Sequence, residues 1–188
     1  MAKDLENKTA IVTAASRGIG LAIAEKLVAE GAIVYMAVRD SEKNRQLTEQ
    51  LHDQNENYRC VFYDAFDFTT YAPMIQQVVD EVGHLDILVN NFGTTDVSKD
   101  TTLVDGDSKA FFDIVDKNIA SVYYTSKYAV KAMLKQETGG SIVNISSVAG
   151  TTPDISRLAY GVSKAAINSL TKQTAVEYAR NKIRANAV

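Results

Sequence analysis

The sequence contains a single cysteine, no long apolar run and no signal peptide. Because Cys60 is alone, an internal disulfide and a cysteine metal cluster are excluded, which favours a reducing compartment. No segment approaches the ~18 consecutive apolar residues of a transmembrane helix. The charged N-terminus (residues 3–8) lacks the apolar core of a signal peptide. These absences predict a cytoplasmic protein with no membrane partner and no metal.

The chain also lacks a strong excess of charge and any sign of internal division. Its net charge of −3 over 188 residues gives no electrostatic reason to expect nucleic acid or an anionic membrane as a partner. No internal repeat, low-complexity tract or linker appears, so residues 1–188 are predicted to form one domain. With 46% hydrophobic residues, a chain of this length can bury roughly 70% of its unfolded surface.

Strand-like and helix-like segments alternate along the whole chain. A polar loop is predicted over 92–106, Ser41 is a plausible N-cap and Gly31 a natural C-cap. The alternation predicts right-handed crossovers and an α/β fold with a Rossmann-like, doubly wound parallel sheet. The predicted strands are 9–13, 32–38, 58–63, 85–90, 141–145 and 183–188, and the predicted helices are 19–30, 41–54, 73–82, 111–135 and 158–179.

The first predicted strand ends in a glycine-containing turn. Residues 13–20 read Thr-Ala-Ala-Ser-Arg-Gly-Ile-Gly. Gly18 lets the backbone approach a pyrophosphate, Gly20 permits close packing of the helix on the sheet, and the helix N-terminus offers free N–H groups. The glycines alone are also compatible with a simple tight turn. Arg17 inside the turn, a strand before it and a helix after it favour nucleotide binding, although the spacing differs from G-x-G-x-x-G.

A second pattern follows the strand that begins at Ser141. Tyr160 and Lys164 lie four residues apart at the head of a predicted helix, which places both side chains on one face. An ammonium beside a phenol favours the phenolate and lowers a tyrosine pKa from its ordinary value near ~10. Such a tyrosine can exchange a proton near neutral pH, and Ser147 can donate to the same substrate oxygen. A Tyr-x-x-x-Lys pair alone is more typical of a solvated helix face, and the catalytic interpretation depends on the motifs that precede it.

Taken together, these motifs resemble those of the short-chain dehydrogenase/reductase family. The glycine turn is similar to its T-G-x-x-x-G-x-G motif, with Ala14 in place of the first glycine, and 90–93 is similar to N-N-A-G, with Phe92 in place of alanine. Residues 186–188 resemble the start of N-x-V-x-P-G. The remaining matches are the tetrad asparagine at Asn118, the catalytic serine at Ser147, thirteen residues before Tyr160, and the Y-x-x-x-K pair at Tyr160 and Lys164.

The resemblance implies an oxidoreductase that transfers a hydride between a nicotinamide cofactor and a secondary alcohol or ketone. It implies that Asn118 holds a water in a proton relay with Lys164, and that Asn90 stabilises the centre of the sheet. A small-molecule substrate and a homo-oligomer, dimer or tetramer, are the implied partners. The implied catalytic residues are Asn118, Ser147, Tyr160 and Lys164, and the implied cofactor contacts are Thr13, Ser16, Arg17, Gly18, Ile19, Gly20, Arg39, Asp64, Ala65, Asn91, Gly93, Tyr160 and Lys164. Ser146 is predicted to be structural, and His52 and His84 are predicted to lie on the surface.

The end of the second strand bears on which nicotinamide cofactor is used. A carboxylate there binds the ribose 2′-hydroxyl of NAD, whereas a cation binds the 2′-phosphate of NADP. Val38 occupies the position where NAD-type family members usually carry aspartate, and Arg39 follows it. Arg17 can reach the same phosphate. Asp40 is a counter-argument, because it could repel the phosphate or pull Arg39 away. The sequence favours NADP(H).

The substrate and the extent of the chain rest on resemblance alone. The segment from Val143 through 153–157 to Ala187 is similar to that of clostridial-type 7α-hydroxysteroid dehydrogenases, which implies the 7α-hydroxyl of a bile acid. A 3-oxoacyl-carrier-protein reductase and another NADP-linked alcohol dehydrogenase are the alternatives within the class. Val188 precedes the family's substrate lid and last strand, so the sheet is expected to be C-terminally incomplete here. A nucleotide-binding remnant without turnover is therefore the alternative outside the class.

Overall fold

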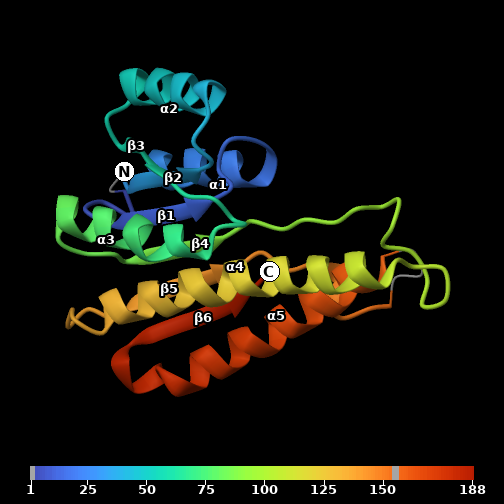
Figure 1. Cartoon of the computed structure of the whole chain (residues 1–188). Helices are drawn as coiled ribbons and strands as arrows, with labels where there is room; N and C mark the ends of the chain where they lie inside the picture. The colour runs from blue at the N-terminus through green and yellow to red at the C-terminus, as the bar shows by residue number, and fades with distance from the viewer. Residues whose placement is uncertain (1–2, 154–156) are drawn as a thin grey trace.

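The computed structural model describes residues 3–153 and 157–188 and contains one parallel sheet (Figure 1). Its strand order is β3-β2-β1-β4-β5-β6, so the chain moves outward from β1 to β3 and then returns to the other side of β1. Ligands bind at such a reversal of strand order, beyond the carboxyl ends of the strands. The strands are β1 (Thr9–Thr13), β2 (Ile33–Val38), β3 (Tyr58–Phe62), β4 (Ile87–Asn90), β5 (Gly140–Asn144) and β6 (Ile183–Ala187).

Helices cover both faces of this sheet, which confirms the predicted doubly wound α/β architecture. One apolar core lies under α1 and α2 and includes Ala24 and Val28 of α1. The other lies under α3 and α4 and includes Met74 and Met133. Figure 1 shows α4 and α5 alongside β5 and β6. The helices are α1 (Gly18–Ala29), α2 (Glu42–Gln54), α3 (Tyr71–Val82), α4 (Ser108–Met133) and α5 (Leu158–Glu177).

Local capping explains where the helices begin and end. The Ser41 hydroxyl accepts a hydrogen bond from Asn44 N at 3.3 Å, and Gly31 follows α1 with a φ of +95°, so both predicted caps are confirmed. The predicted start of α4 at Phe111 was three residues late. Asp107 accepts from Ala110 N at 2.7 Å and therefore starts the helix at Ser108, before its apolar pattern begins.

A buried polar network joins the carboxyl ends of β4 and β5 to the helices beneath them. Asn90 and Asn144 are register partners, and Asn90 Nδ2 donates to Asn144 Oδ1 at 2.8 Å. Asn90 also donates to Ser126 and accepts from Thr125, both on α4, and Asn144 donates to Thr171 on α5. Because a buried amide must have its hydrogen bonds satisfied, this network fixes the strand ends relative to α4 and α5.

The two histidines differ in environment. His52 is exposed, as predicted. His84 also lies at the surface, as predicted, with 39% of its side chain exposed, and its Nε2 lies 3.2 Å from both Asp86 Oδ2 and Thr9 Oγ1. The short connection from α3 to β4 brings it against these groups at the amino end of the sheet, opposite the ligand-binding edge.

No helix among the described residues is long and apolar enough to cross a membrane.

Candidate active site

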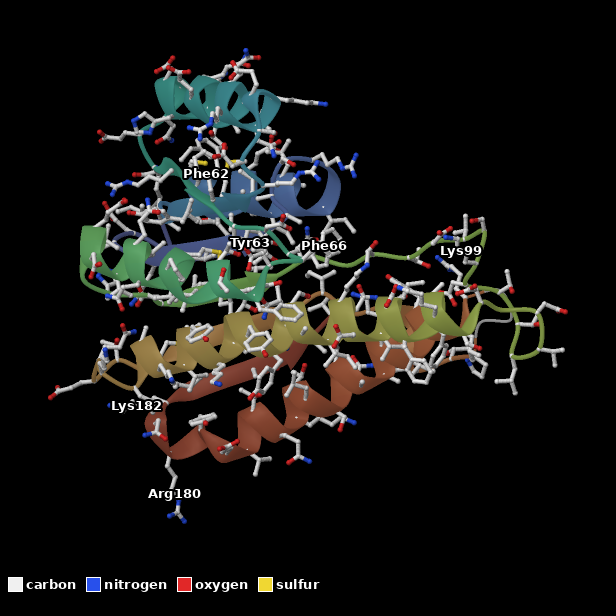
Figure 2. The ribbon with its side chains drawn as sticks, viewed as in Figure 1. Phe62, Tyr63, Phe66, Lys99, Arg180 and Lys182 are labelled. Carbon is white, nitrogen blue, oxygen red and sulfur yellow. The ribbon has the colours of Figure 1, made fainter. Side chains whose placement is uncertain are left out.

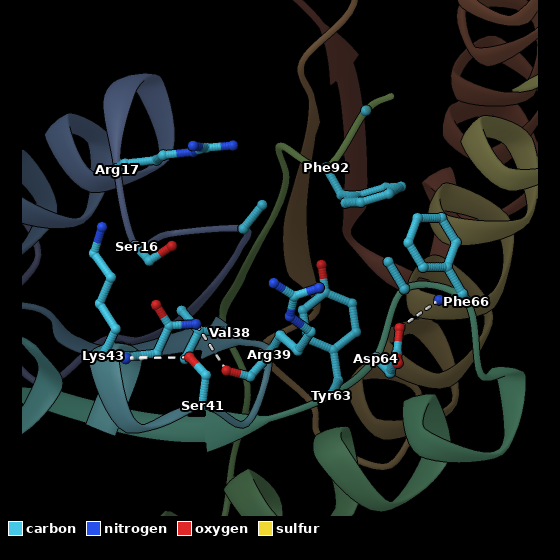
Figure 3. A pocket seen from close by; sticks show the side chains of 14 residues that line it. Ser16, Arg17, Val38, Arg39, Ser41, Lys43, Tyr63, Asp64, Phe66 and Phe92 are labelled. Carbon is cyan, nitrogen blue, oxygen red and sulfur yellow. Dashed lines mark hydrogen bonds between the residues drawn. The ribbon is translucent and has the colours of Figure 1, made fainter. Parts of the chain in front are cut away.

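A cavity of about 390 Å³ opens beyond the carboxyl ends of β1, β2 and β3, and Figure 3 shows it from close by. Six of the predicted cofactor residues line it: Ser16, Arg17, Arg39, Asp64, Ala65 and Gly93. Three polar residues at the start of α2 also line it, and sequence reasoning did not include them: the N-cap Ser41 and the first-turn residues Lys43 and Asn44. The remaining lining residues are Ala14, Val38, Tyr63, Phe66 and Phe92.

The glycine turn forms one wall of the cavity and leads into α1. Gly18 has a φ of +55°, and a Cβ placed on it would meet nothing within 4 Å. A Cβ on Gly20 would lie 2.5 Å from both the Ala14 carbonyl oxygen and Asn91 Nδ2, so only glycine permits this contact. Ile19 lies between them and is 64% exposed. Arg17 precedes α1 without a side-chain capping bond, so the first-turn N–H groups of the helix have no side-chain partner from it.

Ala14, where the family motif has its first glycine, adopts a left-handed conformation with a φ of +53°. An alanine in this region costs about 1–2 kcal/mol relative to its favoured conformations, whereas glycine adopts it freely. The turn therefore keeps the backbone path of a glycine at this position without having the glycine. The Gly20 and Asn91 contacts with the Ala14 carbonyl help to hold that path.

Thr13 and Asn91 brace the turn from behind and do not line the cavity. The Thr13 hydroxyl accepts from the backbone N–H groups of Asn91 at 2.9 Å and Phe92 at 3.1 Å. In return, Asn91 Nδ2 donates to the carbonyls of Thr13 at 3.2 Å and Ala14 at 3.3 Å. These four bonds tie the end of β1 to the end of β4. Both residues therefore shape the site through the backbone.

Basic side chains surround the part of the cavity next to β2. Figure 3 shows Arg17 and Lys43 on one side and Arg39 extending between them and the aromatic side. Asp40 is the residue that argued against NADP(H) in the sequence. Its carboxylate makes a bidentate ion pair with Arg45 at 2.6 and 2.7 Å. Its carboxylate is therefore neutralised by Arg45, and Arg39 forms no ion pair with the described residues. The wall next to β2 is left with a net positive charge.

The opposite side of the cavity is aromatic. The Phe66 and Phe92 rings pack edge to face with centroids 5.9 Å apart (Figure 3), and Phe66 follows the loop from β3 (Figure 2). Asp64 accepts from Phe66 N at 2.9 Å, which turns that loop toward the cavity. Tyr63 is buried beneath, and burial raises the pKa of its hydroxyl above the ordinary value, so it stays neutral. This side offers ring faces to a planar group.

Lys164 is the buried cation next to this cavity. Its side chain is 3% exposed, and its ammonium donates to the Ile145 carbonyl at 2.7 Å and lies 5.5 Å from the centroid of the Tyr160 ring. Burial lowers the pKa of Lys164 to about 8. A Cβ placed on Gly93 would be 3.4 Å from Nζ, so the ammonium lies beside the Asn91–Gly93 turn. The structure thus brings together Tyr160, Lys164 and Gly93, as predicted from the motifs.

Tyr160 lies between two cations. It is half-buried in the first turn of α5, with Lys164 one turn further along. The Arg157 guanidinium carbon is 5.4 Å from its ring centroid, a contact that sequence reasoning missed. Arg157 precedes α5 directly, three residues before Tyr160, so its helix-face spacing was the available signal. The Tyr160 ring therefore makes cation–π contacts with both Arg157 and Lys164.

Ser147 lies in the connection between β5 and α5. Ser147 follows β5, and its hydroxyl accepts from Ala149 N at 3.2 Å in the short helix η2 (Val148–Gly150). η2 is joined to α5 by Asn168 Nδ2, which donates to the Gly150 carbonyl at 3.2 Å. Within the described residues, Ser147 forms no hydrogen bond with Tyr160. Residues 154–156 of the segment used for the substrate comparison lie outside the described residues.

The Asn118 side chain is fully buried in α4 and connects two parts of the site. Its Nδ2 donates to the Thr94 carbonyl and to Ser163 Oγ, both at 2.9 Å, and its Oδ1 accepts from Thr94 N at 2.8 Å. Ser163 in turn donates to the Tyr160 carbonyl at 2.7 Å. Both amide hydrogens are therefore used within the protein. The water relay inferred for Asn118 stays a prediction.

Known proteins are similar to this chain in sequence and in fold. Residues 8–188 match the family model described as short chain dehydrogenase. The chain is 48% identical over 186 residues to the 7α-hydroxysteroid dehydrogenase of Clostridium sardiniense, covering 99% of this chain and 71% of that protein. It is 50% identical over 184 residues to the enzyme of the same name from Paraclostridium sordellii, covering 98% of this chain and 68% of that protein. A crystal structure of a short-chain type dehydrogenase/reductase from Mycobacterium marinum matches with a TM-score of 0.90 at 32% identity, covering 99% of this chain and 75% of that one.

Proposed function

This chain belongs to the short-chain dehydrogenase family of oxidoreductases, and from that premise we propose that it transfers a hydride between NADP(H) and the 7α-hydroxyl of a bile acid. The observation that carries the proposed chemistry is the buried Lys164 ammonium 5.5 Å from the Tyr160 ring, beside the Asn91–Gly93 turn. The proposed substrate class is supported by relatives that are 48% and 50% identical and are named 7α-hydroxysteroid dehydrogenases.

The cavity has the donor set that a dinucleotide phosphate requires. The N-terminus of α1 faces it without a side-chain cap, and Arg17, Arg39 and Lys43 line it together with the hydroxyls of Ser16 and Ser41. The positive wall suits the 2′-phosphate of NADP, and the Phe66–Phe92 side suits a planar ring. When bound, the nicotinamide would accept or supply the hydride, and the protein would position the two reactants.

The proposed reaction assigns a task to each catalytic side chain. In the oxidising direction, Tyr160 takes the proton of the substrate hydroxyl at its phenolic oxygen. The Ser147 hydroxyl donates to the substrate oxygen and holds it in place. Lys164 keeps a positive charge beside the Tyr160 ring and binds the nicotinamide ribose, while Asn118 supports the water chain. In the reducing direction Tyr160 returns the proton to the carbonyl oxygen.

The positive wall leads to a prediction about cofactor choice. Arg39→Ala should weaken NADPH binding by ~10–100-fold, because a hydrogen bond to a charged group contributes about 1.5–3 kcal/mol. Lys43→Ala should cause a smaller loss, because an ammonium is a point charge without bidentate geometry. Titration by nucleotide fluorescence measures both, and NADH is the internal control, since its affinity should not change. Equal affinities of the parent for NADPH and NADH would contradict the cofactor proposal.

The substrate proposal is tested by turnover. The protein should reduce NADP⁺ with bile acids that carry a 7α-hydroxyl, and the matched 7β-hydroxy epimers should give no rate above background. Simple secondary alcohols are tested with NADP⁺ in the same screen, and 3-oxoacyl thioesters are tested with NADPH, because their 3-oxo group accepts the hydride. Turnover confined to the thioesters would replace the proposal by a 3-oxoacyl reductase, and cofactor binding with no turnover of any substrate would favour a nucleotide-binding remnant.

Three further predictions belong with this proposal. We place the protein in the cytoplasm and expect it to form a dimer or tetramer. The organisation of 1–188 as one domain also stays a prediction.

A further inference from the structure

Arg157, the described residue directly before the helix that carries Tyr160, does not cap this helix with its side chain. This helix, α5, starts at Leu158. The first N–H groups of a helix have no partner inside the helix. Ala159 is fully buried and Tyr160 half-buried, so water cannot easily satisfy these groups. Another part of the chain has to provide the acceptors.

Asp100, in the loop between β4 and α4, provides them. The Ala159 N–H donates to Asp100 Oδ1 at 2.7 Å, and the Tyr160 N–H donates to Oδ2 at 3.0 Å. The Leu158 N–H lies 3.4 Å from the carbonyl oxygen of the next residue, Thr101. Asp100 is 3% exposed, so its carboxylate is withdrawn from water and committed to these bonds. A carboxylate at a helix N-terminus is favoured by both the charge-assisted bonds and the helix dipole.

Asp100 is itself held in place on the loop. Thr95 Oγ1 donates to Asp100 Oδ2 at 3.0 Å, and the Asp100 N–H donates to the Asp96 carbonyl at 2.7 Å. Thr94, directly before, is bound through both its N–H and its carbonyl to the Asn118 side chain. Figure 2 shows the adjacent Lys99 on this loop, beside the N-terminal end of α4. The segment 94–100 therefore forms a continuous link from Asn118 to the backbone of Tyr160.

We propose that Asp100 is a positioning residue, which fixes the first turn of α5 and so holds the Tyr160 hydroxyl in place for proton transfer. This proposal rests on the proposed dehydrogenase function. Lys164 is much less dependent on Asp100, because it lies one turn further along and its ammonium is anchored to the Ile145 carbonyl. Loss of the Asp100 carboxylate should therefore disturb Tyr160 and leave the Lys164 contact in place.

Asp100→Ala and Asp100→Asn test the proposal. In Asp100→Ala, the Ala159 and Tyr160 amide protons should exchange with solvent at least ~10-fold faster, because they lose their acceptors. The kcat should fall by ~10–100-fold, the range expected for a misplaced catalytic group, and the KM for NADPH should stay within about 3-fold. Asp100→Asn keeps one acceptor oxygen and should give intermediate values of both exchange and kcat.

Asp107→Ala is the matched control. Asp107 caps α4 by accepting from Ala110 N at 2.7 Å, and it ends the same loop. Its loss should lower the melting temperature without changing kcat or the exchange of the Tyr160 amide. If the Asp100 cap only stabilised the fold, Asp100→Ala and Asp107→Ala would both lower the melting temperature and would have the same effect on kcat and on the exchange of the Tyr160 amide.

The outcomes separate this proposal from the proposed function. If the parent turns over no alcohol, the dehydrogenase proposal fails, and the amide exchange still decides whether Asp100 holds Tyr160. Unchanged exchange in Asp100→Ala, or an active Asp100→Ala protein with the kcat of the parent, would overturn the positioning role. If Asp100→Ala does not fold, Asp100→Asn takes its place, and parental kcat and exchange in that variant would overturn the role equally.

Discussion

Tyr160→Phe should lower the rate of hydride transfer by at least ~10²-fold while leaving NADPH affinity nearly unchanged. The substitution removes only the phenolic oxygen. The ring that remains can keep its packing between the Arg157 and Lys164 cations, at 5.4 and 5.5 Å from its centroid. In the proposed function, cofactor binding depends on the positive wall and on Lys164, and the substitution changes neither. A nucleotide titration and a single-turnover measurement with the same preparation separate the two quantities.

Tyr123→Phe is the matched control for this variant. Tyr123 is 44% exposed on α4, so removing its hydroxyl should change neither the rate nor the affinity. A Tyr160→Phe protein that reacts within a few-fold of the parent would show that another group transfers the proton, and the assignment of Tyr160 would be wrong. A loss of cofactor affinity equal to the loss of rate would instead indicate that the ring had moved.

The local elements of this fold could be predicted because each carries its own signal. β1 is buried along its whole length, as expected for a central parallel strand, and its continuous apolar and β-branched run identified it. Ser41, three residues after the end of β2, identified the start of α2. The start of α4 was misplaced because the apolar pattern begins at Phe111, whereas the capping residue Asp107 lies four residues before it. Apolar periodicity cannot identify a helical turn that is made of polar residues.

The site was predictable as a set of motifs and unpredictable as a set of contacts. Tyr160 and Lys164 are close because their spacing matches one helical turn, which sequence reasoning can see. The partner of Lys164, the Ile145 carbonyl, and the partner of the Tyr160 backbone, Asp100, come from distant segments. No local pattern marks such pairs. The sequence also did not show which arginine Asp40 would pair with. The structure pairs it with Arg45, a contact that depends on how α2 follows β2.

Replacing the buried Lys164 should impair function strongly and change stability little at pH 7. Lys164→Met keeps the length of the side chain and removes the ammonium, so both the rate and NADPH affinity should fall, the rate by at least ~10²-fold. At pH 7 the free energy of unfolding should change little. The variant no longer bears the cost of a buried charge, but it leaves the Ile145 carbonyl without its donor, at a cost of about 1–3 kcal/mol. Lys172→Met, at an exposed position of the same helix, should keep the rate and affinity of the parent.

The pH dependence of stability reveals the burial of this ammonium directly. Its pKa is about 8 in the folded protein and 10.5 in its ordinary environment. Between these values the unfolded chain binds more protons at Lys164, so stability rises with pH in this window, by on the order of 3 kcal/mol when complete. Below pH 8 the lysine is charged in both states and the full burial cost remains. Urea unfolding of the parent and of Lys164→Met at pH 7 and pH 10 should therefore show the parent gaining stability relative to the variant. Because all other groups are common to both proteins, a difference that does not change with pH would mean that the Lys164 ammonium is not desolvated.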